Sequence, residues 1–366
     1  MDKRLRKTAP ALLLCLALVT ACTPVPKPQG TAAPTPARVT PATPAKTPAP
    51  AADTAADYFA FKADRRLTYR GTGNEFASYV TLVDYLKNGV AQTRQDNGGT
   101  TTVFVYALAD NAIKRVFSRE ETYFKYDFTA SFNDDEVLVK EPIRTGNSWT
   151  LGDGSVRAIT AVDKKVTTPS GTYRALEITT TGAESAQKDY YAKDIGLVKS
   201  EFASGGNTVT SELESIEIGV FAKATVRFYF PEFDRQKAVY EERAVETKTN
   251  EDAVPKLRLG LQTVPFGSGL TKTLSDDTKI LGVSLDDGKG IVTVDFSKEL
   301  IEKMNAGTAL EGLIIKSITN TFGHYYGMDK VVIHVEGKPY ESGHVMLRPG
   351  EYFNVSDDGT AEYQAP

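Results

Sequence analysis

The sequence has few of the residues from which metal sites, disulfide frameworks and nucleic-acid surfaces are built. It contains two cysteines and three histidines in 366 residues, which excludes a disulfide framework and a cysteine-based zinc site. Its formal net charge is −4, and no long basic run follows the first seven residues, so binding to nucleic acid through phosphate contacts is not expected. Hydrophobic residues make up 41% and charged residues 25%, as in an ordinary globular protein. We therefore predict a protein without a metal, a cofactor or a nucleic-acid partner.

A targeting segment is expected at residues 1–21. A basic start is followed by an apolar run from Ala9 to Val19, which is too short to span a bilayer core of about 30 Å as a helix. The run ends in Val19-Thr20-Ala21-Cys22, which resembles the lipobox of bacterial lipoproteins. The alternative is an ordinary secretory signal that has Cys22 near its cleavage point. We expect a lipidated Cys22, with acyl chains such as palmitate, that anchors the chain to the outer face of the cytoplasmic membrane, or to the outer membrane in a cell with two membranes.

Residues 22–56 are expected to form a tether between the lipidated cysteine and the folded part. Nine of the 18 prolines lie in residues 23–56, among many alanines and threonines. Such a composition buries no core, and its prolines favour extended conformations. A proline-rich ligand for a partner domain is the alternative, but a spacer is the prediction.

Residues 57–218 show the alternation that is typical of short antiparallel strands. Apolar and polar side chains alternate at residues 102–107 and 173–178, and turn pairs such as Asp153-Gly154 and Gly206-Asn207 separate the runs. No helical period is found there. We predict an all-β antiparallel domain, folded as a sandwich or a partial barrel.

Residues 222–345 show both helical and strand patterns, which makes the fold class α+β overall. Helices are expected from Asn250, as the N-cap, to Gln262 and from Thr308 to Phe322. Strands are expected at 224–230, where Pro231 would end the run, and at 280–286, 290–296 and 331–335. The predicted order is β-α-β-β-α-β, with both helices on one face of the sheet and residues 346–366 as a C-terminal tail.

The second of these helices is expected to bury a single stripe against the sheet. Its stripe consists of Leu310, Leu313, Ile314 and Ile318, which keep helical spacing. Glu311 and Lys316 are expected on the opposite, exposed face, within reach of a partner.

Residues 222–345 resemble the GerMN domain of the GerM family of sporulation and germination lipoproteins. The resemblance lies in Val226–Pro231, in Val335–Lys338 and, most specifically, in the run from Val283 to Ser297. It implies a fold similar to the ring-building modules of secretion systems and a non-catalytic role in an assembly. Residues 57–218 resemble β-rich modules of other bacterial lipoproteins only distantly, through motifs such as Gly146-Asn147-Ser148-Trp149.

No motif for catalysis or metal binding is found. The histidines, at positions 324, 334 and 344, form no HExxH motif and no pair on one helical turn. Ser268 lacks the spacing of a nucleophile elbow, and Asp286-Asp287 fits a solvated turn better than a calcium loop. No catalytic residue is therefore assigned.

The first domain has one unusual feature, a high density of aromatic side chains. A strand at 123–128 would send Tyr123 to one face and Phe124, Tyr126 and Phe128 to the other. These side chains, with Trp149, either belong to the core or line a groove for an apolar or glycan ligand.

Together these patterns predict an exported lipoprotein with a non-enzymatic structural or interaction role in the cell envelope. Its expected partners are the membrane, through the anchor, and an envelope protein or a second copy, through residues 222–345. The resemblance implies a link to sporulation or germination. Two alternatives stay open: a lipid or glycan carrier, which a concave apolar pocket would favour, and a cell-wall hydrolase, which two converging carboxylates would favour.

Overall fold

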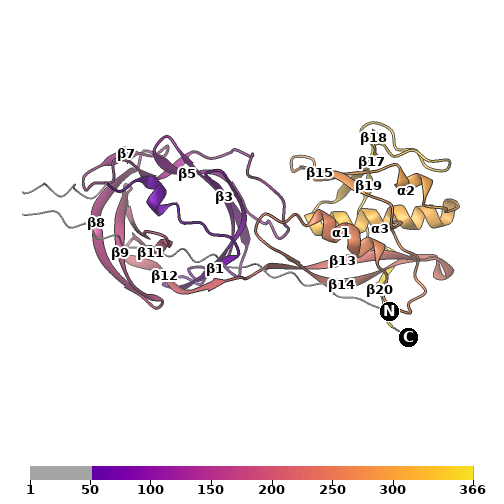
Figure 1. Cartoon of the computed structure of the whole chain (residues 1–366), viewed down its shortest axis with the longest axis horizontal. Helices are drawn as coiled ribbons and strands as arrows, with labels where there is room; N and C mark the ends of the chain where they lie inside the picture. Colours follow the sequence, from indigo (N-terminus) through magenta and orange to yellow (C-terminus); the bar gives the residue numbers. More distant parts are fainter. Residues whose placement is uncertain (1–51, 366) are drawn as a thin grey trace, which may run out of the picture. The chain divides into compact units, whose positions relative to one another are not determined.

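The computed structural model describes residues 52–365, and within them the chain is mostly β-structure with a few helices (Figure 1). Residues Ala51–Pro366 form one compact unit. The signal segment, Cys22 and most of the tether lie outside the described residues. Within residues 52–365, no helix combines the length and the apolar character needed to cross a membrane. The α+β class that the sequence predicts is confirmed.

One antiparallel sheet of 12 strands takes up residues 65–218. Strands that follow each other in the sequence are paired, except for β6 and β7, which are the two edges of the sheet. The first strand, β1, also pairs with the last, β12. A short 3-10 helix, η1 (Ala55–Tyr58), precedes the sheet. The strands are β1 (Arg65–Thr72), β2 (Tyr79–Lys87), β3 (Val90–Asp96), β4 (Thr101–Ala109), β5 (Ala112–Arg119), β6 (Glu136–Lys140), β7 (Ser148–Thr150), β8 (Val156–Thr168), β9 (Gly171–Thr181), β10 (Ser185–Ala192), β11 (Gly196–Ser204) and β12 (Asn207–Ile218).

The sheet curls round on itself (Figure 1). Hydrogen bonds from side chains connect its two ends. The carbonyl of Val137 on β6 accepts hydrogen bonds from Trp149 Nε1 at 3.0 Å and from Arg157 Nη1 at 2.7 Å. Asn147 Nδ2 donates to the carbonyl of Lys140 at 2.8 Å. The partial barrel predicted from the alternation is therefore held closed by side chains, which also satisfy carbonyl groups of the β6 edge.

The rest of the chain forms two smaller sheets with helices. The first sheet has the order β13 (Ala222–Glu232), β14 (Lys237–Thr247) and β20 (Thr360–Glu362). The second contains β15 (Ile280–Asp286), β16 (Ile291–Phe296), β17 (Lys330–Val335), β18 (Lys338–Pro339) and β19 (Phe353–Asn354). The helices are α1 (Val254–Gln262), the short α2 (Glu299–Glu302) and α3 (Thr308–Tyr326), and a 3-10 turn, η2 (Phe233–Arg235), joins β13 to β14.

Helix α3 lies between these two sheets, with β13 and β14 on one side and β16 and β17 on the other (Figure 1). A helix in such a position has no wide solvent face, so α3 is buried over most of its circumference from Ser317 to Gly323. The prediction of a single buried stripe with Glu311 exposed is wrong, because Glu311 is itself buried. The predicted contacts of Ile314 and Ile318 with the core are confirmed, whereas Leu310 and Leu313 are only partly buried.

The predicted order of elements omits β14, the hairpin partner of β13. The order found is two strands, α1, two strands, α2, α3 and then β17. Helices α1 and α3 both contact β13, and each also contacts the second sheet, so they do not lie on one face of a single sheet. Strand β13 also continues through Pro231, which pairs with Ala238. It can do so because β13 is an edge strand, where a missing backbone N–H is tolerated.

Two helix ends differ from the predicted ones for local reasons. Helix α1 begins at Val254 rather than at a cap on Asn250, which has a positive φ of 65° and accepts a hydrogen bond from the Leu86 N–H at 2.7 Å. Helix α3 runs one turn further than Phe322 and ends at Gly327, which adopts the left-handed conformation that favours glycine.

A shared hydrophobic core joins side chains from both regions of the compact unit. Val103, Val105, Phe124 and Phe128 belong to the same buried cluster as Phe228 and the apolar face of α3. The ring of Phe124 meets that of Tyr326 edge to face at 5.1 Å, a favourable aromatic geometry.

The packing of α1 on β13 generates a prediction at Gly260. A Cβ built on Gly260 would lie 2.0 Å from Cε1 of Phe228, which is fully buried, so Gly260→Ala is expected to lower the free energy of unfolding by about 1–3 kcal/mol. Gly312→Ala in α3 is the matched control, because nothing lies within 4 Å of its Cβ position and alanine has the higher helix propensity. Urea unfolding followed by circular dichroism measures both variants. An equal urea midpoint for Gly260→Ala and the unchanged protein would contradict this packing.

Candidate functional site

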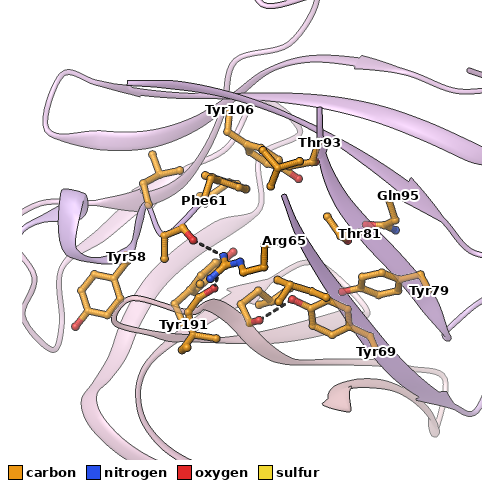
Figure 2. A pocket seen from close by; sticks show the side chains of 18 residues that line it. Tyr58, Phe61, Arg65, Tyr69, Tyr79, Thr81, Thr93, Gln95, Tyr106 and Tyr191 are labelled. Carbon is orange, nitrogen blue, oxygen red and sulfur yellow. Dashed lines mark hydrogen bonds between the residues drawn. The ribbon is translucent and has the colours of Figure 1, made fainter. Parts of the chain in front are cut away.

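The candidate site is a cavity inside the curled 12-stranded sheet (Figure 2). The cavity has a volume of about 120 Å³, which is several times the volume needed to hold one water molecule. Its walls come from the segment after η1, from strands β1 to β6 and from β10 and β11. Six aromatic side chains contribute to them: Tyr58, Phe61, Tyr69, Tyr79, Tyr106 and Tyr191.

The two-residue period of the strands explains why these side chains meet. On β1, Arg65, Leu67 and Tyr69 alternate with outward-facing neighbours and all line the cavity. The ring of Tyr69 stacks on that of Tyr79 at 4.4 Å, and the ring of Phe61 stacks on that of Tyr106 at 5.1 Å. The stacked pairs give the cavity rigid, mostly apolar walls.

Burial keeps the cavity tyrosines protonated. It raises the pKa of Tyr106 to about 12 and the pKa values of Tyr79 and Tyr191 well above the ordinary range, because water is excluded from the charged form. Tyr69 donates its hydroxyl proton to the carbonyl of Leu197 at 2.7 Å. At neutral pH these hydroxyls are therefore hydrogen-bond donors.

Arg65 is the charged group of the cavity lining, and only 5% of it is exposed. Its guanidinium donates to the carbonyls of Asp194 at 3.3 Å and Ile195 at 3.1 Å, and also to that of Ala60. Burial lowers the pKa of Arg65, but an arginine pKa starts so high that the group stays charged. The site thus combines apolar walls with a buried cation.

The five aromatic residues predicted to form a groove do not come together around this cavity. Residues 120–135 contain no strand, so the expected alternation of Tyr123 against Phe124, Tyr126 and Phe128 is wrong. This irregular segment turns Phe124 and Phe128 into the core beside Tyr326, and it leaves Tyr123 exposed.

Trp149 lies apart from the other four predicted groove residues. It packs in a separate cluster with Ile113, Val139 and Ile159. The sequence reasoning missed the residues that do line the cavity, although one signal was present. An arginine at position 65 shares the inward face of an alternating run with Leu67 and Tyr69.

A second polar cluster surrounds Glu311 at the start of α3. Glu311 is 2% exposed and accepts hydrogen bonds from the Tyr340 hydroxyl at 2.8 Å and from Ser342 Oγ at 2.5 Å. His344 Nδ1 lies 2.9 Å from its other carboxylate oxygen. Burial and the neighbouring carboxylate raise the pKa of Tyr340.

The side chains of this cluster do not form the serine–histidine contact of a catalytic triad. Ser342 donates its hydroxyl proton to Glu311 rather than to His344. His324 contacts Asp357 at 3.0 Å, and His334 lies on β17. In the part of the chain from residue 52 to 365, no group of three or more histidines, cysteines and carboxylates is placed to hold a metal ion.

The burial of Glu311 generates a prediction of stability. Glu311→Ala leaves the buried hydroxyl donors of Tyr340 and Ser342 without their acceptor, so the free energy of unfolding is expected to fall by about 1–3 kcal/mol. Glu302→Ala is the matched control, since that exposed carboxylate pairs only with Lys298 and is expected to contribute less than about 0.5 kcal/mol. Denaturant unfolding at pH 7 compares the two, and a negligible effect of Glu311→Ala would show that the cluster does not stabilise the fold.

The chain is similar to several solved structures over part of its length. An exported protein with a YmcC-like fold from Bacteroides fragilis is 15% identical, with 44% of this chain and 98% of that chain covered and a TM-score of 0.28. A protein described as a lipoprotein, from Clostridium perfringens, is 21% identical, with 37% and 89% covered and a TM-score of 0.25. The tandem GerMN domains of the sporulation protein GerM from Bacillus subtilis are 18% identical, with 34% and 44% covered and a TM-score of 0.27.

Among curated proteins there is no match to this chain. One family model does match, and its description is "Germane: Sporulation and spore germination". The match covers residues 227–341, which lie inside the range 222–345 where the GerMN resemblance was recognised. The resemblance to the GerM-type family is therefore confirmed, and residues 227–341 are a Germane region.

Proposed function

We propose that this protein is an exported, lipid-anchored protein of the cell envelope that acts without catalysis. In this proposal the Germane region binds an envelope protein or a second copy of the chain. The observation that carries the proposal is the Germane match over residues 227–341, in a chain that begins with a lipobox-like segment ending at Cys22. The link to sporulation or germination rests on the description of that family alone.

Two apolar side chains in the Germane region support a role in binding. Leu259 on α1 is 59% exposed, and Phe266 in the following loop is fully exposed. On the same helix, Leu257 and Leu261 are fully buried, so the apolar face of α1 is already packed in the core. Exposed apolar side chains that add nothing to the core are suited to contact with a partner.

Cross-linking in intact cells tests this surface. Leu259→Asp and Phe266→Asp are expected to keep the unfolding midpoint and to reduce at least severalfold the yield of the cross-linked species. Phe132→Asp is the matched control, because Phe132 is an aromatic residue outside the Germane region and its 71% exposure lies between those of Leu259 and Phe266. Unchanged cross-linking of Leu259→Asp and Phe266→Asp would contradict a partner surface here, and the mass of the cross-linked species distinguishes an envelope protein from a second copy.

The anchor is tested at Cys22. Cys22→Ala is expected to abolish metabolic labelling with palmitate and to remove the protein from washed membranes, because the acylated thiol is lost. The unchanged chain is the control, and an unmodified N-terminus in its mass spectrum would overturn the anchor.

Incubation of the purified chain with peptidoglycan tests the absence of catalysis. Release of soluble fragments that a single carboxylate substitution abolishes without loss of stability would favour the hydrolase alternative instead.

A further inference from the structure

We propose that the cavity inside the curled sheet binds a small amphipathic carboxylate, with an apolar body such as an acyl chain and a head group that pairs with Arg65. The proposal is independent of the partner-binding role of the Germane region, because the cavity lies among strands that this region does not include. It concerns a ligand site rather than a protein surface.

The first argument is that Arg65 lacks a counter-charge. Among residues 52–365 its guanidinium contacts three backbone carbonyls and no carboxylate, and its Nε has no hydrogen-bond partner. The other arginines set deep in the same sheet are paired. Arg157 contacts Glu136 at 2.7 Å, and Arg94 contacts Asp84 at 3.0 Å.

A buried charge without an opposite charge is unfavourable, since the low-dielectric surroundings do not replace the lost hydration. The neutral carbonyls compensate only part of this cost. A carboxylate that enters the cavity would supply the missing charge, and the same low dielectric would strengthen its attraction to the guanidinium. Arg65 therefore favours an anionic head group over a neutral or cationic one.

The second argument is that the rest of the lining suits an apolar body. Aliphatic side chains complete the aromatic walls: Leu67, Val83, Ile113, Leu138, Ile195 and Leu197. Besides Arg65 and the tyrosine hydroxyls, the polar side chains of the lining are Thr81, Thr93 and Gln95. A sugar carries several hydroxyl groups around the edge of its ring and would leave most of them unpaired against such walls, whereas an acyl chain has none to pair.

The third argument is the presence of unused donors. The hydroxyls of Tyr79 and Tyr191 line the cavity, and neither forms a hydrogen bond with another group in the described part of the chain. Because burial holds both pKa values well above the ordinary range, both groups keep their proton and can donate to an acceptor. Donors and a cation in one cavity are complementary to a carboxylate, which only accepts.

Displacement of a fluorescent fatty acid tests the proposal. Residues 52–366 contain the described part of the compact unit, and circular dichroism first verifies that the purified protein is folded. Parinarate is bound as the reporter and is then displaced by dodecanoate or by dodecan-1-ol, which shares the alkyl chain but has no charge. Dodecanoate is expected to displace parinarate at a concentration at least about tenfold lower than dodecan-1-ol, as the loss of a charged hydrogen bond predicts.

Variants then locate the binding. Arg65→Gln is expected to weaken the binding of dodecanoate at least about tenfold and to leave the binding of dodecan-1-ol unchanged, because the alcohol has no charge to pair with the guanidinium that is lost. Arg66→Gln is the matched control, since Arg66 is the next residue of β1, faces away from the cavity and pairs with Glu217 at 3.9 Å. Thr81→Phe fills the cavity and is expected to abolish binding of both ligands, and it serves as the test if Arg65→Gln does not fold.

Three results would overturn the proposal. The first is that dodecanoate does not displace parinarate. The second is that dodecanoate and dodecan-1-ol displace parinarate at the same concentration. The third is that the Thr81→Phe variant folds and binds both ligands as the unchanged protein does. None of them bears on the cross-linking of the Germane region, so the two proposals can fail separately.

Discussion

The structure depends on how a 12-stranded antiparallel sheet closes without pairing its own edges. Strands β6 and β7 lie at the ends of the sheet. The indole of Trp149 on β7 and the guanidinium of Arg157 on the adjacent strand β8 both donate to one carbonyl of β6, that of Val137. Side chains can bridge a gap that backbone hydrogen bonds cannot span, so the strands need not tilt into a fully paired cylinder. The curvature that results encloses an interior which the side chains only partly fill, and the cavity beside Arg65 is the consequence.

A different constraint shapes the Germane region, where α3 lies between two sheets. A helix covered on both sides buries polar groups as well as apolar ones, and these need partners. Glu311 finds them in Tyr340 and Ser342, and Asn320 exchanges hydrogen bonds with the backbone of Ser356. The polar contacts of the C-terminal segment are therefore part of the fold of this region.

The two regions suggest different kinds of binding. The Germane region has exposed apolar side chains on its surface, among them Leu259 and Phe266. The curled sheet has its unexplained feature inside, in a buried cation without a counter-charge. A lipid anchor at Cys22 would hold both regions in the envelope, where partners and acyl chains are present at high effective concentration.

Elements whose patterns are local can be predicted from the sequence. Alternation and turn residues were enough to predict an antiparallel curled sheet. The bounds predicted for β15, Ile280–Asp286, are those observed. The run from Val283 to Ser297, together with Val226–Pro231 and Val335–Lys338, was enough to recognise the resemblance of the Germane region. Such features depend on neighbours in the chain, since side-chain period and turn conformation are set within a few residues.

Contacts between segments that are distant in the sequence become visible in the tertiary structure alone. It placed Glu311 inside, because the segment that carries Tyr340 and Ser342 folds over the start of α3. It let β13 continue through Pro231, because no strand within residues 52–365 pairs with the outer edge of β13. It brought Arg65 and the tyrosines of four strands around one cavity, while Phe124 and Phe128 went to the core instead. The physical reason is that burial and charge pairing depend on contacts far apart in the sequence, which no local period encodes.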